Sequence, residues 1–370
     1  MNVLIAPDKF KGTLTGMEAA RAIQNGWKKG RPNDEVRLLP ICDGGDGFGE
    51  TLADIEQAKA MICQTIDAAH RPISATWWWQ EKHKLAIVES AGIIGLAQLP
   101  PEKYHPFELD TFGLGTVLEE ISQHGARTCV VGIGGSATND GGFGMARALG
   151  WKFYSEDESE ISAWNQLDKV SSVVGPERSH LFENCIIASD VENLLLGKEG
   201  ASRIYGPQKG LKPDDMQKSE ACLEALSATV DAFVNHRWSL EPGSGAAGGL
   251  GYGLMAFLGG KAQSGFDLFA KRVSLSNQLD WADLVITGEG SLDPSSLMGK
   301  GVGSIAQECA KIGKNCIGVA GKANITKELS HLFQNIYAIT PHFTDPQSAQ
   351  SSAPKWLTLL AEKASKDIQS

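Results

Sequence analysis

Residues 128–149, TCVVGIGGSATNDGGFGMARAL, are the stretch of this 370-residue chain that says most about its fold. The apolar run 128–133 predicts a buried strand, and residues 145–149 predict a helix. A loop rich in glycine and small polar residues lies between them. A buried strand, a glycine-rich loop and a helix in this order indicate an α/β fold with parallel strands.

The loop between this strand and this helix has the composition of a ligand-binding segment. Its successive backbone N–H groups are suited to an anion-binding nest, its hydroxyl groups add donors, and its last polar side chains are suited to a metal ion or a substrate hydroxyl. The candidate ligand groups of the loop are Gly134, Gly135, Ser136, Thr138, Asn139 and Asp140.

The same strand–loop–helix pattern recurs along the chain. A capping box, Thr15 followed by Glu18, marks the start of a helix at 17–29, and a second helix is predicted at 116–123. The polar segment 155–180 predicts an irregular surface excursion. Short apolar runs predict strands at 3–6, 36–39, 85–89, 185–188, 284–287, 315–320 and 337–340.

Loops with acidic, lysine and glycine residues follow several of these strands, at the sheet edge where α/β proteins bind ligands. Asp8, Lys9 and Lys11 follow the first strand and precede a helix, which is a favourable place for an anion. In Asp43-Gly44-Gly45-Asp46-Gly47 the glycines allow close backbone approach, and the two carboxylates suit Mg²⁺ held through water. A solvated turn and a glycine-rich hairpin explain these two loops equally well.

The second half of the chain carries further candidates. Asp190 follows a predicted strand as a candidate general base or metal ligand, and Lys209 is a candidate phosphate contact. A helix cap and a surface turn are the structural alternatives for these two residues. The run 242–251 matches a dinucleotide fingerprint formally, but a poor strand precedes it, and tight helix packing explains its glycines and alanines.

Composition excludes several classes of protein. The net charge is −10 and no basic run is present, which disfavours a nucleic-acid binder. The seven cysteines are odd in number and show no CxxC spacing, so we expect reduced thiols and no zinc site. No apolar stretch reaches the length of a membrane span, so we expect a cytoplasmic protein that binds no membrane. A homo-oligomer remains open.

The loops together resemble those of the bacterial type I glycerate kinases, in the same order from end to end. GGSATNDGG and GPQKG are highly specific as a pair. The resemblance implies transfer of the γ-phosphoryl group of Mg-ATP to the 2-hydroxyl of D-glycerate, giving 2-phosphoglycerate. The motifs are APDKFKG (6–12), DGGDG (43–47), GIGGSATNDGG (132–142), ASDVEN (188–193), GASRIYGPQKG (200–210), PGSGAAGGLG (242–251) and TGEGSLD (287–293), followed by Gly299-Lys300.

The resemblance also implies two α/β domains with an active site in the cleft between them. Residues 1–75 and 280–370 are expected to form a Rossmann or flavodoxin-like parallel sheet from both chain ends. Residues 76–279 are expected to form an inserted second α/β domain. The chain itself offers candidate crossings at 66–79 and 276–283.

Residue roles follow from the resemblance and from the needs of phosphoryl transfer, which are positioning and charge neutralisation. Backbone N–H groups of 134–138, with Lys209 or Lys11, are expected to meet the phosphates, and Asp190 to polarise the acceptor hydroxyl. Asp43, Asp46 and Asp140 are the candidates for Mg²⁺ or its waters, and Lys11 or Lys300 for the glycerate carboxylate. Which loop binds ATP stays open. The remaining candidate binding residues are Asp8, Lys9, Gly44, Gly45, Asn193 and Glu289.

One departure from the family pattern bears on the substrate. Ser291 stands where most relatives carry arginine, which removes an anion contact or transfers that role to Lys9. A kinase of another hydroxy acid, such as tartronate, therefore stays open. A nicotinamide-dependent oxidoreductase built on Gly132-x-Gly134-x-x-Ala137 is disfavoured, because residues 156–160, where its acid is due, have no strand character. A non-catalytic sensor of hydroxy acids is disfavoured because every loop acid is present.

Overall fold

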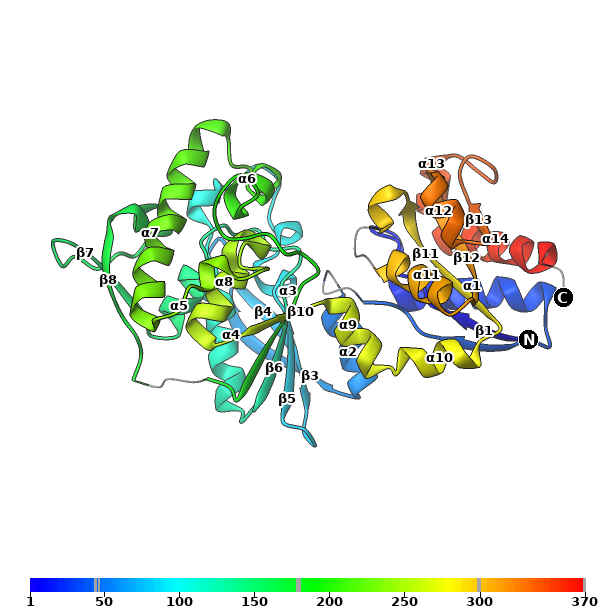
Figure 1. The fold of residues 1–370 in the computed structure, drawn as a ribbon, viewed down its shortest axis with the longest axis horizontal. Helices are drawn as coiled ribbons and strands as arrows, with labels where there is room; N and C mark the ends of the chain where they lie inside the picture. The colour runs from blue at the N-terminus through cyan, green and yellow to red at the C-terminus, as the bar shows by residue number, and fades with distance from the viewer. Residues whose placement is uncertain (43–44, 46, 178–180, 298–300, 369–370) are drawn as a thin grey trace. The chain divides into compact units, whose positions relative to one another are not determined.

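The computed structural model describes residues 1–42, 45, 47–177, 181–297 and 301–368. The chain divides into two compact units, unit 1 with Met1–Asp43 and Phe266–Ser370, and unit 2 with Gly44–Gly265. In Figure 1 the dark blue N-terminal segment and the yellow-to-red segment from residue 266 onward make unit 1. The predicted limits were 75/76 and 279/280. The structure instead assigns residues 44–75 to unit 2 and residues 266–279 to unit 1.

Unit 1 is built on a five-stranded parallel sheet that uses both ends of the chain. Numbered by their order within the unit, its strands lie in the sequence 2-1-3-4-5, which is the flavodoxin-like order. All strands point the same way, but the order in which the chain adds them across the sheet reverses between the first and third strands. In such sheets ligands bind at this switch point, outside the carboxyl ends of the strands. The strands in sheet order are β13 (Asn335–Ala338), β12 (Asn315–Ala323), β11 (Leu284–Leu292), β1 (Asn2–Ile5) and β2 (Glu35–Leu38).

Helices α1 (Gly16–Gly30) and α14 (Ala353–Asp367), from opposite ends of the chain, pack directly together. A Cβ on Gly26 would lie 2.0 Å from the carbonyl oxygen of Thr358, so only glycine allows this approach. The predicted capping box of Thr15 and Glu18 is present at the start of α1. The other helices of this part are α9 (Gly265–Arg272), α10 (Leu275–Trp281), α11 (Gly301–Lys311), α12 (Lys327–Leu332) and α13 (Pro346–Ser351).

Unit 2 is built on a six-stranded mixed sheet. Its last four strands in chain order are parallel, and the first two form an antiparallel extension. The predicted crossing at 66–79 is wrong, because Trp77 and Trp79 lie inside a strand and are buried in the core of this unit. The strands in sheet order are β10 (Lys261–Gln263), β9 (Asn184–Ala188), β6 (Thr128–Gly132), β5 (Leu85–Glu89), β4 (Pro72–Gln80) and β3 (Lys59–Ile66).

The segment predicted as an irregular excursion contains regular structure. Strand β8 (Val170–Val174) pairs antiparallel with β7 (Lys152–Ser155) in a separate two-stranded sheet. Seven α-helices surround the large sheet in the part of unit 2 that the structure describes. They are α2 (Phe48–Glu56), α3 (Ala91–Ile94), α4 (Phe112–Gln123), α5 (Phe143–Ala148), α6 (Ala201–Tyr205), α7 (Met216–Val234) and α8 (Ala246–Leu258).

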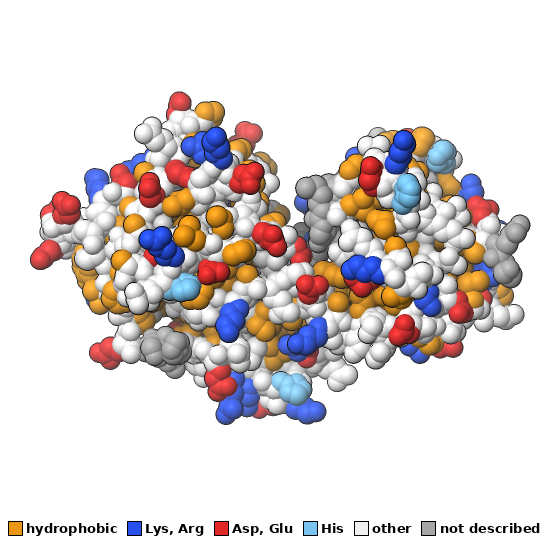
Figure 2. Space-filling view, in the orientation of Figure 1, with side chains coloured by type: hydrophobic (Ala, Val, Ile, Leu, Met, Phe, Trp, Pro, Cys, Tyr) orange, Lys and Arg blue, Asp and Glu red, His pale blue; other side chains and the backbone are white. Residues whose placement is uncertain are grey.

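The cysteines, the surface charges and the helices can each be compared with what the composition predicts. All seven cysteines are buried free thiols. Figure 2 shows acidic and basic side chains interspersed on the face drawn. Among the described residues, no helix is both long enough and apolar enough to span a bilayer.

Candidate active site

The parallel strands of unit 2 end in register, which brings four loops to one edge of the sheet. Glu89 of β5 pairs with Gly132 of β6, Gly132 with Ala188 of β9, and Ala188 with Gln263 of β10. The loops that begin after these residues therefore start side by side. They include the glycine-rich loop 133–142 and Asp190, both of which the sequence offers as candidates.

Lys209 fixes the first half of the glycine-rich loop. Its Nζ donates to Oγ of Ser136 at 3.0 Å and to the carbonyl oxygen of Thr138 at 2.6 Å. The Ser136 hydroxyl in turn donates to the carbonyl oxygen of Ala247 at 2.9 Å. Lys209 is only 7% exposed, so the surface turn that was its structural alternative is excluded. The lysine acts here as an internal clamp on the loop.

Helix α8 packs its glycines against the same loop. Ala247, Gly248 and Gly249 have φ values of 56°, 74° and 83°, so the helix backbone turns left-handed where it meets the loop. A Cβ on Gly248 would lie 2.1 Å from the carbonyl oxygen of Thr138 and 2.8 Å from Nζ of Lys209. The interpretation of 242–251 as tight helix packing is confirmed.

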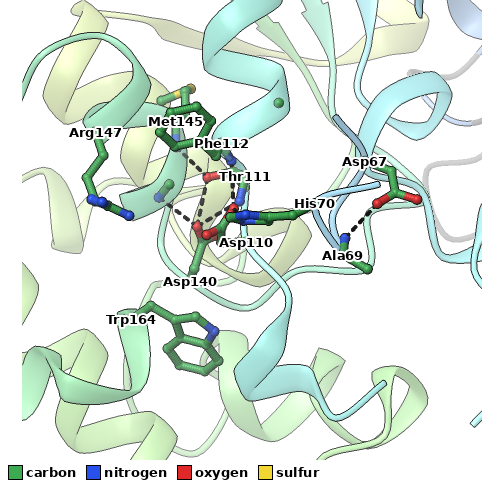
Figure 3. Close-up of polar contacts among 12 residues, drawn as sticks. Asp67, Ala69, His70, Asp110, Thr111, Phe112, Asp140, Met145, Arg147 and Trp164 are labelled. Carbon is green, nitrogen blue, oxygen red and sulfur yellow. Dashed lines mark hydrogen bonds and ion pairs between the residues drawn. The ribbon is translucent and has the colours of Figure 1, made fainter. Parts of the chain in front are cut away.

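Asp140 fixes the second half of the loop (Figure 3). Its Oδ2 accepts hydrogen bonds from the amide and hydroxyl of Thr111, at 3.0 and 2.8 Å, and from the amide of Gly144 at 2.9 Å. Its Oδ1 accepts from the amide of Gly142 at 3.3 Å. The side chain is fully buried. These contacts give Asp140 the geometry of a loop anchor, which differs from the water-facing carboxylate expected of a Mg²⁺ ligand.

The buried charges of this region shift each other's protonation. Burial and the nearby Asp110 carboxylate raise the pKa of Asp140 to about 6, although its hydrogen bonds from Gly144 and Thr111 act in the opposite direction. Burial lowers the pKa of Lys209 to about 7, and the Asp140 carboxylate opposes that shift. The Asp140 carboxylate therefore holds Lys209 nearer to its charged form.

Asn139 turns into the protein interior. It is fully buried, and its Nδ2 donates to the hydroxyls of Ser202 on α6 and Ser219 on α7, at 3.2 and 2.8 Å. The contacts make Asn139 a link between the loop and two helices, where sequence predicted a ligand group. Among the residues of the loop, Gly134 is half-buried and Gly135 is exposed with φ 78°, so their backbone is what the loop offers to a ligand.

Asp190 lies just beyond β9, as predicted. Its Oδ1 accepts a hydrogen bond of 2.7 Å from the hydroxyl of Ser264, which follows the neighbouring strand β10. Asn193, three residues further along, links this loop to the segment that follows it. Its Nδ2 donates to the carbonyl oxygen of Glu199 at 2.9 Å, and its Oδ1 accepts a hydrogen bond from the Tyr205 hydroxyl at 2.6 Å.

Unit 1 gathers its candidates at the switch point of its own sheet. The Asp8 amide donates to the carbonyl oxygen of Gly288 at 2.8 Å, which places Asp8, just past the end of β1, beside Glu289 in the second half of β11. Both acids and Lys9 are half-buried, whereas Lys11 is exposed. This loop precedes helix α1, as predicted, and Thr15 and Glu18 form the predicted capping box at the start of that helix.

Four predicted site residues, Asp43, Gly44, Asp46 and Lys300, lie outside the described residues. Gly45 accepts a hydrogen bond from the Phe48 amide through its carbonyl oxygen at 3.0 Å. No group of three or more His, Cys, Asp or Glu residues within the described ranges is arranged to hold a metal ion. Mg²⁺ bound chiefly through substrate phosphates needs only one or two carboxylates from the protein.

Sequence reasoning missed several residues that shape the site. Glu89 accepts hydrogen bonds from the amides of Gly47 and Gly49, at 2.9 and 3.0 Å, and so caps helix α2. Thr111 and Ser264 hold the carboxylates of Asp140 and Asp190. An Asp-Thr pair before a helix looks like an ordinary N-cap, and a lone serine carries no signal. Only the fold brings these partners together.

His70 is a partly exposed histidine that pairs with Asp110, the carboxylate near the buried Asp140. Its Nε2 lies 2.9 Å from Oδ1 of Asp110 (Figure 3), and the hydrogen bond raises the pKa of His70 although partial burial opposes the shift. A raised pKa in the folded state means that the pair stabilises fully below the unfolded pKa of about 6.5, and that this contribution is lost as pH rises through the folded pKa.

We therefore expect His70→Asn to lower the melting temperature most near pH ~5.5, with the difference from wild type shrinking toward pH ~9. Asparagine tolerates the left-handed backbone of residue 70, whose φ is 59°, so the variant isolates the charge. Thermal melts across this pH range measure it, with exposed His83→Asn as the control. A difference in melting temperature between His70→Asn and wild type that does not change with pH would contradict the stabilising charge pair between His70 and Asp110.

Comparison with known proteins connects this geometry to a family. The sequence model of the glycerate kinase family matches residues 3–369. A glycerate kinase from Halalkalibacterium halodurans is 32% identical over 99% of this chain and 97% of its own length. A glycerate 2-kinase from Escherichia coli K12 is 34% identical over 87% of this chain and 85% of its own length. The crystal structure of a protein named as a candidate glycerate kinase 2 from Salmonella typhimurium LT2 superposes with a TM-score of 0.83 at 30% identity, covering 99% of this chain and 97% of that one.

Proposed function

The chain belongs to the glycerate kinase family and is an ATP-dependent kinase, and we propose that it phosphorylates D-glycerate on the 2-hydroxyl, with Mg²⁺, to give 2-phosphoglycerate and ADP. The observation that carries the proposal is the family match over residues 3–369 together with the two-sided anchoring of the loop 133–142. A loop held this firmly at a sheet edge is suited to hold phosphates in one position.

The accessible backbone of Gly134 and Gly135 is the proposed phosphate contact of unit 2. Its N–H groups need no reorganisation, because Lys209 and Asp140 hold the residues that follow. Lys209 thus serves the reaction mainly by fixing the loop and by adding positive charge behind it. Phosphoryl transfer gains most from such fixed groups, since there is little covalent chemistry for the protein to perform.

Asp190 is the proposed group that polarises the acceptor hydroxyl. Its carboxylate follows a strand next to the one that carries the phosphate loop, and the Ser264 hydroxyl orients it. A carboxylate in this role accepts the hydroxyl proton as the new oxygen–phosphorus bond forms and the bond to the ADP leaving group breaks.

Cations of unit 1 are the proposed anchors for anionic substrate groups. Lys9 and Lys11 follow β1, and Lys322 of β12 is the register partner of Ser291. An ammonium group thus stands beside the position where relatives carry arginine, and a carboxylate contact remains available. Mg²⁺ would be held by the phosphates with one or two carboxylates, for which Asp8 and Glu289 have suitable oxygen donors.

Release of ADP on addition of D-glycerate, ATP and Mg²⁺ tests the proposal. We expect turnover that needs all three components and stops on chelation of the metal. L-glycerate and tartronate serve as competing acceptors, since tartronate is the second candidate substrate that Ser291 leaves open. Turnover with tartronate and none with glycerate would overturn the substrate assignment and leave the kinase class in place.

A further inference from the structure

We propose that Thr111 is a positioning residue of the kinase reaction, which holds the phosphate loop 133–142 through Asp140. The inference rests on the proposed function, because it takes this loop to bind phosphate groups. Thr111 belongs to none of the sequence motifs of the family resemblance, and it reaches the loop from the segment that precedes helix α4.

Every hydrogen-bonding group of Thr111 that faces the loop is engaged with it. The amide and the hydroxyl both donate to Oδ2 of Asp140, at 3.0 and 2.8 Å. The same hydroxyl accepts a hydrogen bond of 2.8 Å from the amide of Met145. Figure 3 shows these contacts converging between helices α4 and α5. Thr111 is fully buried, so water cannot replace them at low cost.

The start of helix α5 depends on these contacts. Its N-cap residue is Gly142, which has φ 78° and no side chain with which to cap the helix. The amides of Gly144 and Met145 in the first turn have no acceptor within the helix and instead donate to Asp140 and Thr111 respectively. One of the two capping acceptors, the Thr111 hydroxyl, is thus supplied from another segment of the chain.

Packing leaves this region no room for adjustment. A Cβ on Gly144 would lie 2.6 Å from the amide nitrogen of Phe112 and 2.8 Å from that of Thr111. On the other side, a Cβ on Gly142 would lie 2.7 Å from Cα of Gly253 in α8. The end of the loop is therefore held between two backbones, and Thr111 sets its position on one side.

Thr111 is linked to the proposed phosphate contacts at Gly134 and Gly135 through Asp140 and then through Lys209. Asp140 is two residues from Thr138, whose carbonyl oxygen binds Lys209, and the Asp140 carboxylate also attracts that lysine. Lys209 binds Ser136, which follows Gly135 directly. Misplacement of a reacting group by about 1 Å costs up to ~10²-fold in rate.

Thr111→Val keeps the shape of the side chain and removes its hydroxyl. We expect this variant to lose about 10–100-fold in kcat/KM for ATP and to bind ATP about 10-fold more weakly by calorimetry. Thr111→Ser restores the hydroxyl and should stay within about 3-fold of wild type. Should the valine variant fail to fold, Thr111→Ala removes the hydroxyl without placing a methyl group against the Asp140 carboxylate and the Met145 amide.

The matched control is Thr65→Val. Thr65 is also buried, and its hydroxyl donates to the carbonyl oxygen of Gly113 in the same helix α4 at 2.8 Å, away from Asp140. It should lose melting temperature without losing kcat/KM in the folded enzyme. Wild-type kcat/KM in Thr111→Val, or equal losses in the Thr111 and Thr65 variants, would overturn the inference. ATP binding that depends on Thr111, in a chain that does not phosphorylate glycerate, would refute the proposed substrate alone.

Discussion

Asp190→Asn is expected to lower kcat by about 10²–10⁴-fold while changing KM for either substrate far less. Asparagine keeps the size of the side chain and can still accept a hydrogen bond from Ser264. It cannot take up the hydroxyl proton, and that interaction develops only in the transition state. Steady-state kinetics with D-glycerate and ATP, each varied in turn, measures the separation of kcat from KM.

Asp231→Asn is the matched control for this variant. Asp231 also accepts a hydrogen bond from a serine hydroxyl, that of Ser239 at 2.6 Å, but it lies within helix α7 and does not follow a strand of the sheet. It should change stability and leave kcat unaltered. If Asp190→Asn keeps kcat and instead weakens ATP binding, Asp190 is a nucleotide or metal residue.

Lys209→Met is expected to reduce kcat/KM by about 10²-fold or more and to destabilise unit 2 by about 1–3 kcal/mol. The loss of the ammonium group leaves the carbonyl oxygen of Thr138 without its buried donor and removes the positive charge beside Asp140. The loop then loses one of its two anchors, and the phosphates lose a fixed cation.

Kinetics and thermal unfolding of Lys209→Met, compared with the exposed lysine variant Lys198→Met, separate the two effects. Lys198→Met should be close to wild type in both measurements. A Lys209→Met enzyme with lowered stability but full kcat/KM would show that Lys209 serves only the fold and has no part in the reaction.

The central parallel strands β1, β5 and β6 were predictable because each is a short, nearly continuous apolar run that is almost entirely buried. The parallel strand β10 was missed because it is short and largely exposed. Leu85–Glu89 is confirmed to the residue, and the flanking helices α1 and α4 were found to within a few residues. Strands β3 and β4 were missed because their exposed positions alternate with buried ones, and the tryptophans of β4 face both sides of the sheet.

The chemistry of the loops was predictable at the level of residue type, whereas the direction of each side chain was not. Lys209 and Asn139 are polar residues in loops that resemble ligand sites, yet both point into the protein. The partners of Lys209 and Asn139 come from distant parts of the chain. The contacts among these partners join Ser202 to Ser219, 17 residues apart, and Ser136 to Ala247, 111 residues apart. Spacing in the sequence carries no signal for such contacts.

The most direct test of the account is the identity of the phosphorylated product. Which hydroxyl lies in line with the γ-phosphoryl group depends on where the carboxylate is anchored, and the 2-hydroxyl is one carbon nearer to that anchor than the 3-hydroxyl. Enolase dehydrates only 2-phosphoglycerate, so its addition to the reaction should yield phosphoenolpyruvate at the rate of ADP release. A product that is inert to enolase until phosphoglycerate mutase is added would be 3-phosphoglycerate, and would contradict the account.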